Sequence, residues 1–146
     1  MKKLMLCALG AATMVFAVPA SAQDNPLKGG NFWTVAEITI DDGHFSDYAD
    51  HLAGAYRKNL EFSKKKGWLK NSFILSNINK RAGEPDLYLV TISDHVTTPA
   101  EDEVREKELN AYLATTSRDQ DKQSGARAKY RKLGGAMLLQ ELLYKK

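Results

Sequence analysis

The sequence predicts one α+β domain with the element order β-α-β-β-α-β, in which helices cover one face of an antiparallel sheet. Three observations lead to this prediction. Short runs rich in β-branched and aromatic residues alternate with longer amphipathic segments. Turn residues separate the two middle runs closely enough for a hairpin. The 146 residues, 43% hydrophobic and 27% charged, have the composition of a single globular domain and exclude a disordered, collagenous or disulfide-rich chain.

Residues 1–22 are typical of a secretory signal peptide. A short cationic start precedes an apolar segment from Leu4 to Val18, and the small residues 20–22 form a cleavage signal. The apolar segment is shorter than the roughly 20 residues that a spanning helix needs, so we expect no stable membrane anchor. Cleavage between Ala22 and Gln23 would place the mature chain in the periplasm or outside the cell.

The predicted cleavage changes the charge and the cysteine content. The formal net charge of +3 falls by two when two N-terminal lysines are removed. A nearly neutral domain lacks the basic excess of nucleic-acid binders, so no nucleic-acid partner is expected. Loss of the single cysteine, Cys7, excludes disulfides, thiol catalysis and thiolate metal sites from the mature chain.

The elements follow in order along the mature chain. Residues 23–31 contain a proline and a Gly-Gly pair without periodicity, which predicts an N-terminal tether. The domain proper, residues 32–146, opens with the run FWTVAEITI, which predicts a strand over Phe32–Ile40. From His44 to Lys66 apolar residues recur at helical spacing and a glycine follows, which predicts one long amphipathic helix.

The second half of the chain repeats the alternation of strand and helix. Lys70–Ile78 and Leu87–Ile92 predict the two strands of the hairpin. Thr98-Pro99-Ala100-Glu101 is a capping box, which predicts a helix running to about residue 115. A less regular helical stretch is expected in Ser117–Lys132, ended by a Gly-Gly pair. Met137–Tyr144 is expected to form the last strand, with a short helix as the alternative.

Apolar side chains occupy both faces of the predicted strands. Residues 87–92 and 137–144 do not alternate with polar residues, yet two helices cover only one face of a sheet. A second copy would therefore have to cover the other face. In this topology and pattern, the chain from Phe32 to Tyr144 resembles the dimeric α/β-barrel superfamily, in which two ferredoxin-like sheets pack face to face. The resemblance implies a homodimer formed through the sheet face.

The resemblance implies the position of a ligand better than it implies a reaction. Members include cofactor-independent monooxygenases, haem-degrading enzymes, dye peroxidases, chlorite dismutases, muconolactone isomerases and proteins without a known activity, and in several the ligand lies between the sheet and the helices. The Asn, Trp and His set of the haem-degrading members is not matched by Glu37, Tyr88 and His95. We therefore expect no cofactor.

Five residues are candidates for a ligand-binding cleft between the long helix and the sheet: Glu37, Tyr48, His51, Tyr56 and Tyr88. The helical candidates alternate with small residues that leave space beside large rings. Glu37 is the one charged side chain within the first strand, where burial without a partner would cost several kcal/mol. Strand parity alone does not tell which sheet face Glu37 and Tyr88 share.

Other patterns indicate no specific chemistry. His44, Asp47 and His51 have helical spacing, but no fourth ligand lies nearby, so no metal site is expected. A solvated helix face is expected for the basic residues Arg127, Lys129, Arg131 and Lys132. Phosphate loops, nucleophile elbows and zinc signatures are absent from the sequence.

Two functions remain open. The favoured one is an exported domain that binds a small apolar or aromatic molecule in the cleft or acts as an interaction domain. The alternative is a cofactor-independent monooxygenase or isomerase acting on small aromatic compounds, with His51, Glu37 or a tyrosine handling protons. Binding is favoured because no acid-base pair, and hence no catalytic residue, can be assigned from the sequence.

Overall fold

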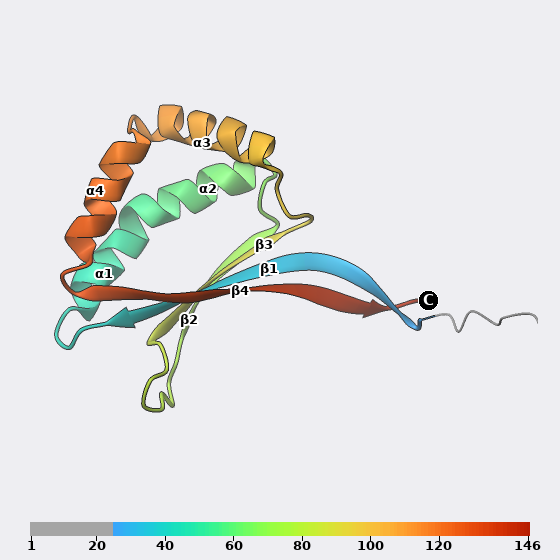
Figure 1. Ribbon diagram of the computed structural model, residues 1–146, viewed down its shortest axis with the longest axis horizontal. Helices are drawn as coiled ribbons and strands as arrows, with labels where there is room; N and C mark the ends of the chain where they lie inside the picture. Colours follow the sequence, from blue (N-terminus) through green and yellow to red (C-terminus); the bar gives the residue numbers. More distant parts are fainter. Residues whose placement is uncertain (1–24) are drawn as a thin grey trace, which may run out of the picture.

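The computed structural model describes residues 25–146, so the predicted signal peptide lies outside the described residues. Four strands form one antiparallel sheet in the order β2-β3-β1-β4, and the helices of these residues lie on one side of it (Figure 1). The strands are β1 (Leu27–Ile40), β2 (Asn71–Ser76), β3 (Leu87–Ser93) and β4 (Arg131–Tyr144). This α+β architecture is compatible with a ferredoxin-like fold.

The predicted helix after β1 is present, with a π-helical segment in its middle. It consists of α1 (Phe45–His51), the π-helix η1 (Leu52–Tyr56) and α2 (Arg57–Lys65), which we call together the long helix. The residues at both junctions have ordinary right-handed helical backbone angles, so the segments run on without a break. Gly67, with a φ of 75°, follows the helix end and supplies the left-handed conformation there.

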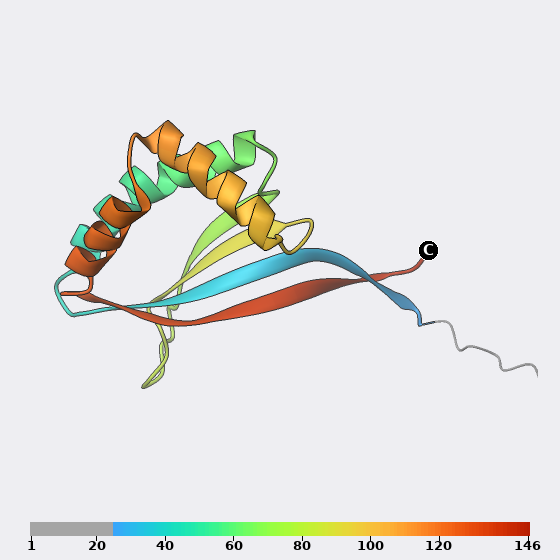
Figure 2. The ribbon, with the colours of Figure 1, turned by 45° about the horizontal axis from the view of Figure 1, so that its top comes forward.

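Two further helices follow β3. The capping box begins α3 (Pro99–Leu113). The Thr98 hydroxyl accepts a hydrogen bond from the Glu101 amide at 3.3 Å, and the Glu101 carboxylate accepts one from the Thr98 amide at 2.8 Å. α4 (Ser117–Arg127) comes next. Neither helix contains a fully buried residue, and both run beside the long helix in Figures 1 and 2. They therefore form an outer pair of helices against the long helix.

The two faces of the sheet carry separate apolar clusters. On the helix side, Tyr48 and Leu52 pack on Ile38, Leu87 and Leu89. On the other side, a second cluster joins residues of β1 and β3 alone, namely Val35, Val90 and Ile92 with Trp33 and Tyr88 packed against them. The long helix is thus fixed to the sheet through one face only.

The first strand is longer than the sequence predicts. Residues 27–31 are not a tether, because they pair with the end of β4 from Tyr144 inward. The glycines in this segment meet side chains of β4: a Cβ at Gly29 would lie 2.6 Å from the Gln140 side chain, and one at Gly30 would lie 2.9 Å from that of Glu141. They serve close approach of two strands and a register shift rather than flexibility.

The last strand also begins earlier than predicted. β4 starts at Arg131, so the second glycine pair lies within the strand and does not end a helix, and the short-helix alternative for its end is wrong. A Cβ at Gly134 would lie 2.8 Å from the Cβ of Glu37, where the β1–β4 register shifts. Bulges on paired strands explain both misplaced boundaries, because they place glycine inside a strand for steric reasons.

Candidate functional site

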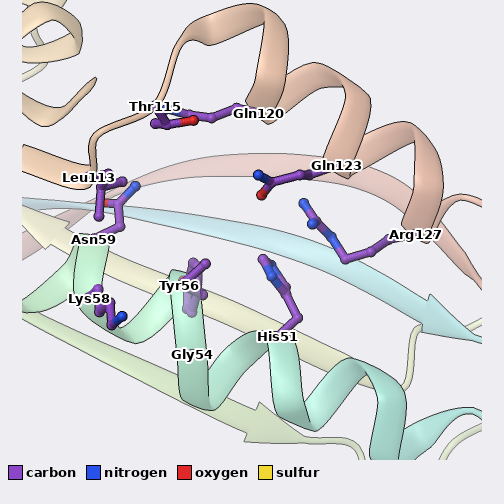
Figure 3. A pocket seen from close by; sticks show the side chains of 11 residues that line it. His51, Gly54, Tyr56, Lys58, Asn59, Leu113, Thr115, Gln120, Gln123 and Arg127 are labelled. Atoms are coloured by element: carbon purple, nitrogen blue, oxygen red, sulfur yellow. The ribbon is translucent and has the colours of Figure 1, made fainter. Parts of the chain in front are cut away.

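A pocket of about 400 Å³ lies between the long helix and α4 (Figure 3). The long helix contributes His51 and Tyr56, and α4 contributes Gln120, Gln123 and Arg127. The pocket adjoins η1, where the π-helical turn takes in an additional residue, a feature frequent at functional sites. We call this cavity the Arg127 pocket.

Two arginines without a carboxylate partner in the described residues lie at this site, Arg127 in the pocket wall and Arg131 outside the lining. The guanidinium of buried Arg131 donates to the backbone and hydroxyl oxygens of Ser124 and lies 5.8 Å from the ring centre of Tyr48. Arg127 is half-buried in the pocket wall. The Nε atoms of both arginines are buried without a hydrogen-bond partner in the structure, and within residues 25–146 neither forms an ion pair. Partly buried positive charge without a counter-charge is costly, so the site favours an anion beside Arg127.

His51 is held as a neutral imidazole beside these charges. Its ring lies between those of Tyr48 and Tyr56, with centroid distances of 5.6 Å and 6.3 Å. Burial, together with the charges of Arg127 and Arg131, lowers the pKa of His51 to about 4. A neutral imidazole has one N–H donor and one acceptor nitrogen. Because His51 makes no hydrogen bond within the described residues, both are available to a ligand.

The two tyrosines beside His51 differ in their positions. Tyr56 lines the pocket, and burial raises its pKa to about 12, so its hydroxyl stays a donor at neutral pH. Tyr48 is 2% exposed and belongs to the core under His51, with its pKa raised mainly by burial. Of the helical candidates, His51 and Tyr56 therefore line the pocket, and Tyr48 packs against His51 from the core.

Glu37 and Tyr88 do not join the helical candidates, so the prediction of one five-residue cleft is wrong. The two residues are cross-strand neighbours on β1 and β3. Tyr88 packs on the cluster of the sheet face opposite the helices, and Glu37 has the strand parity of Val35 in that cluster. The helix-facing parity belongs to Ile38. The pocket itself lies between helices rather than between helix and sheet.

The sequence reading missed the contribution of α4. Arg127 was expected to be solvated, because its segment has no apolar stripe to indicate a buried face. The one available signal is the spacing of Gln120, Gln123 and Arg127, which at i, i+3 and i+7 lie on one helix face. Long polar side chains on one face of a weakly apolar helix therefore indicate a polar pocket better than a solvated surface in this protein.

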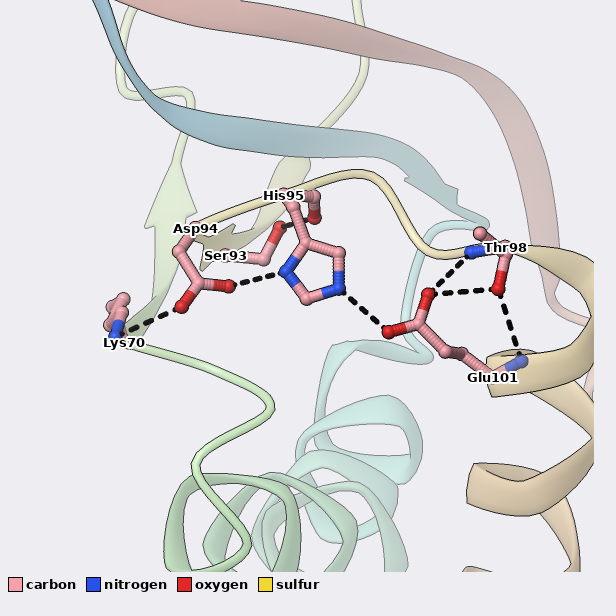
Figure 4. A network of polar contacts seen from close by, with 6 residues as sticks. All are labelled: Lys70, Ser93, Asp94, His95, Thr98 and Glu101. Carbon is pink, nitrogen blue, oxygen red and sulfur yellow. Dashed lines mark hydrogen bonds and ion pairs between the residues drawn. The ribbon is translucent and has the colours of Figure 1, made fainter.

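A second polar network lies at the opposite end of the outer helices (Figure 4). The His95 ring contacts Asp94 at 2.7 Å and Glu101 at 3.0 Å, and Lys70 pairs with Asp94 at 3.2 Å. Hydrogen bonds that the His95 ring donates to the carboxylates of Asp94 and then Glu101 raise the pKa of His95. The Thr98 backbone amide, aided by His95, lowers the pKa of Glu101 to about 2. The network ties the start of α3 to the end of β3, which is a structural role.

The fold and the pocket define an α+β domain with a cationic pocket between helices. Comparisons with protein-family models, with curated proteins and with solved structures find no match. Within residues 25–146, no three His, Cys, Asp or Glu side chains gather as metal ligands, and His44 instead bonds Asp47 at 2.7 Å. In the same residues no helix has the length and hydropathy needed to cross a bilayer.

Proposed function

We propose that this protein binds a small organic anion, such as an aromatic carboxylate, in the Arg127 pocket. The observation that carries the proposal is that half-buried Arg127 lines the pocket and forms no ion pair in the described residues. A carboxylate there would accept charge-assisted hydrogen bonds and offset the charge of neighbouring Arg131. A cation or a neutral hydrocarbon would neither accept hydrogen bonds from Arg127 nor offset the positive charge of the two arginines.

The remaining lining supports a small anion with an organic body. A volume of about 400 Å³ lies within the range of small-molecule sites. Neutral His51 and protonated Tyr56 supply hydrogen-bond donors, and the side-chain amide of Gln123 supplies more, whereas the Gln120 amide already donates to Asn110. Donors from the long helix and α4 thus line one space (Figure 3).

Binding ranks above the alternative of a cofactor-independent monooxygenase or isomerase. Such an enzyme needs a general base whose pKa lies near the working pH. A pKa of about 4 makes His51 a weak proton acceptor at neutral pH. Incubation of the protein with phenolic and quinol compounds under air separates the two functions, because turnover would support the enzyme and ligand recovery without change would support the binder.

The direct test is calorimetry with benzoate and phenylacetate against benzylamine. Arg127→Met should weaken carboxylate binding about 10- to 100-fold, the effect of losing a charged hydrogen bond worth about 1.5–3 kcal/mol. Arg118→Met is the matched control, because Arg118 is an exposed arginine of α4 outside the pocket. Equal affinities of wild type and Arg127→Met, or preferred binding of the amine, would refute the proposal.

We propose in addition that a second copy covers the sheet face opposite the helices, giving the dimeric α/β-barrel arrangement. Supporting this, side chains on that face are exposed around the buried Val35 and Val90, with Phe73 at 40% and Met137 at 42%. Light scattering should give twice the monomer mass. Phe73→Asp should produce monomers, whereas Ile78→Asp, at a loop position 90% exposed, should not. A monomeric wild type would refute the dimer.

Export remains a proposal that rests on the N-terminal sequence. The intact mass of the protein recovered from its native host should correspond to a chain beginning at Gln23. An uncleaved chain as the main species would refute export.

A further inference from the structure

A second cavity of about 300 Å³ lies between α2, α3 and β3. We call it the Trp68 cavity. Apolar surface dominates its lining, which includes Leu60, Trp68, Leu69 and Leu109, while Arg105 and Glu106 of α3 and Thr91 of β3 also line it. The Arg127 pocket, by contrast, gathers long polar side chains of α4. The two cavities therefore differ in the chemistry that they offer.

The two cavities are neighbours along the long helix. Both are lined by Tyr56 and Asn59, and from these residues they extend in opposite directions. On the long helix, residues 51–59 line the first and residues 56–63 the second. On α3, Leu113 lines the first, and residues 105–109 line the second. On passing Tyr56, the lining thus changes from the long polar side chains of α4 to a mainly apolar surface.

In the Trp68 cavity, the Trp68 ring is held by contacts with aromatic and cationic side chains. The ring of Trp68 packs edge-on against Phe62 at 5.4 Å, and Phe62 stacks on Tyr112 of α3 at 4.3 Å. The Nζ of Lys66 and the guanidinium of Arg105 lie over the Trp68 ring at 5.8 Å and 5.5 Å. These contacts hold the indole in place and join α2 to α3.

We propose that the two cavities form one site for an amphipathic carboxylate, with the acid group at Arg127 and an extended apolar chain passing Tyr56 into the Trp68 cavity. This inference rests on the proposed function and names its ligand class. The helical rise places His51 and Leu60 roughly 13 Å apart along the helix axis. That span matches an extended medium-chain fatty acid or an arylalkyl acid of similar length, and exceeds the reach of benzoate.

The test is a calorimetric series of butyrate, hexanoate, octanoate and decanoate, below their micellar concentrations. Each methylene that enters the apolar cavity should tighten binding about fourfold, as expected for burial of one methylene. Arg127→Met should weaken every acid of the series by the same factor. Affinities for these acids that Arg127→Met leaves unchanged would place the acid group elsewhere and overturn the inference.

Filling the Trp68 cavity gives the second arm of the test. Leu109→Trp should remove the gain from hexanoate to decanoate and leave butyrate affinity within twofold of wild type. Val104→Trp is the matched control, since Val104 is an exposed α3 residue outside both cavities. If Leu109→Trp folds poorly, the change of wild-type affinity with chain length still tests whether the apolar chain is bound. Equal affinities for all four acids would overturn the inference while the proposed function stands, and no binding of any acid would overturn both.

Discussion

Arg127 and His51 should be coupled in titration, and Arg127→Met tests that coupling. Both side chains line the same pocket, and the arginine charge disfavours a second positive charge on the imidazole. Removing the guanidinium while keeping an apolar stem of similar length should therefore raise the pKa of His51. The variant separates the electrostatic cause from burial, which it leaves largely in place.

The size of the rise follows from the order of the causes. The pKa of His51 falls from 6.5 to about 4, with burial as the largest cause, then Arg127, then Arg131. Because burial dominates and Arg131 remains, removing Arg127 should restore less than half of the difference, about one pH unit. A bound carboxylate should raise the pKa of His51 in the wild type for the same reason, since it offsets the charge of both arginines.

The assay is NMR observation of the His51 ring protons as a function of pH, with Arg118→Met as the control. Acid denaturation gives a second readout. A lowered folded-state pKa means that the unfolded state binds more protons between about pH 4 and 6.5, so stability should fall as pH decreases through this window and change less below it. The decline should be smaller in Arg127→Met. A wild-type His51 that titrates near 6.5 would refute the placement of this side chain.

Three further predictions concern the scaffold. Thr98→Ala should lower the free energy of unfolding by about 1 kcal/mol through loss of the α3 cap, measured by urea denaturation, and an unchanged midpoint would contradict the capping role. The raised pKa of His95 should give stability that is present below about pH 6.5 and lost as pH rises through the folded-state pKa, and His95→Gln should remove this dependence. Gly134→Ala should lower the melting temperature because its Cβ would clash with Glu37, whereas Gly54→Ala, with open space at that position, should keep or raise it by improving helix propensity.

The local elements of this fold could be predicted from the sequence because their signals are local. The capping box at Thr98, the amphipathic period of the long helix and the glycine after it are all confirmed. The strand ends differ from the prediction because glycine pairs usually indicate a loop or a helix end, whereas Gly29 and Gly134 lie within strands. Their role is to admit side chains of a partner strand that is distant in sequence, which no local pattern shows.

The sequence predicts the helical part of the candidate site, because that part also depends on a local pattern. In the helical period of the sequence Tyr56 belongs to the apolar face and His51 to its edge, and both reach the pocket where η1 separates them. Glu37 depends on strand parity, which is settled only when the long helix packs on Ile38 rather than on its neighbours. Arg127 depends on how α4 docks beside the long helix, and this docking leaves no apolar stripe in the sequence of α4.

The pairing of the first and last strands has a consequence for the order of folding. β1 lies at the centre of the sheet, between β3 and β4, and its pairing with β4 joins Leu27 to Tyr144. Closing so long a loop is entropically costly, and sheets dominated by such distant contacts fold slowly. During synthesis β1 therefore keeps one edge open until β4 has emerged. An unfinished chain therefore exposes a strand edge that needs protection from pairing with other chains until synthesis is complete.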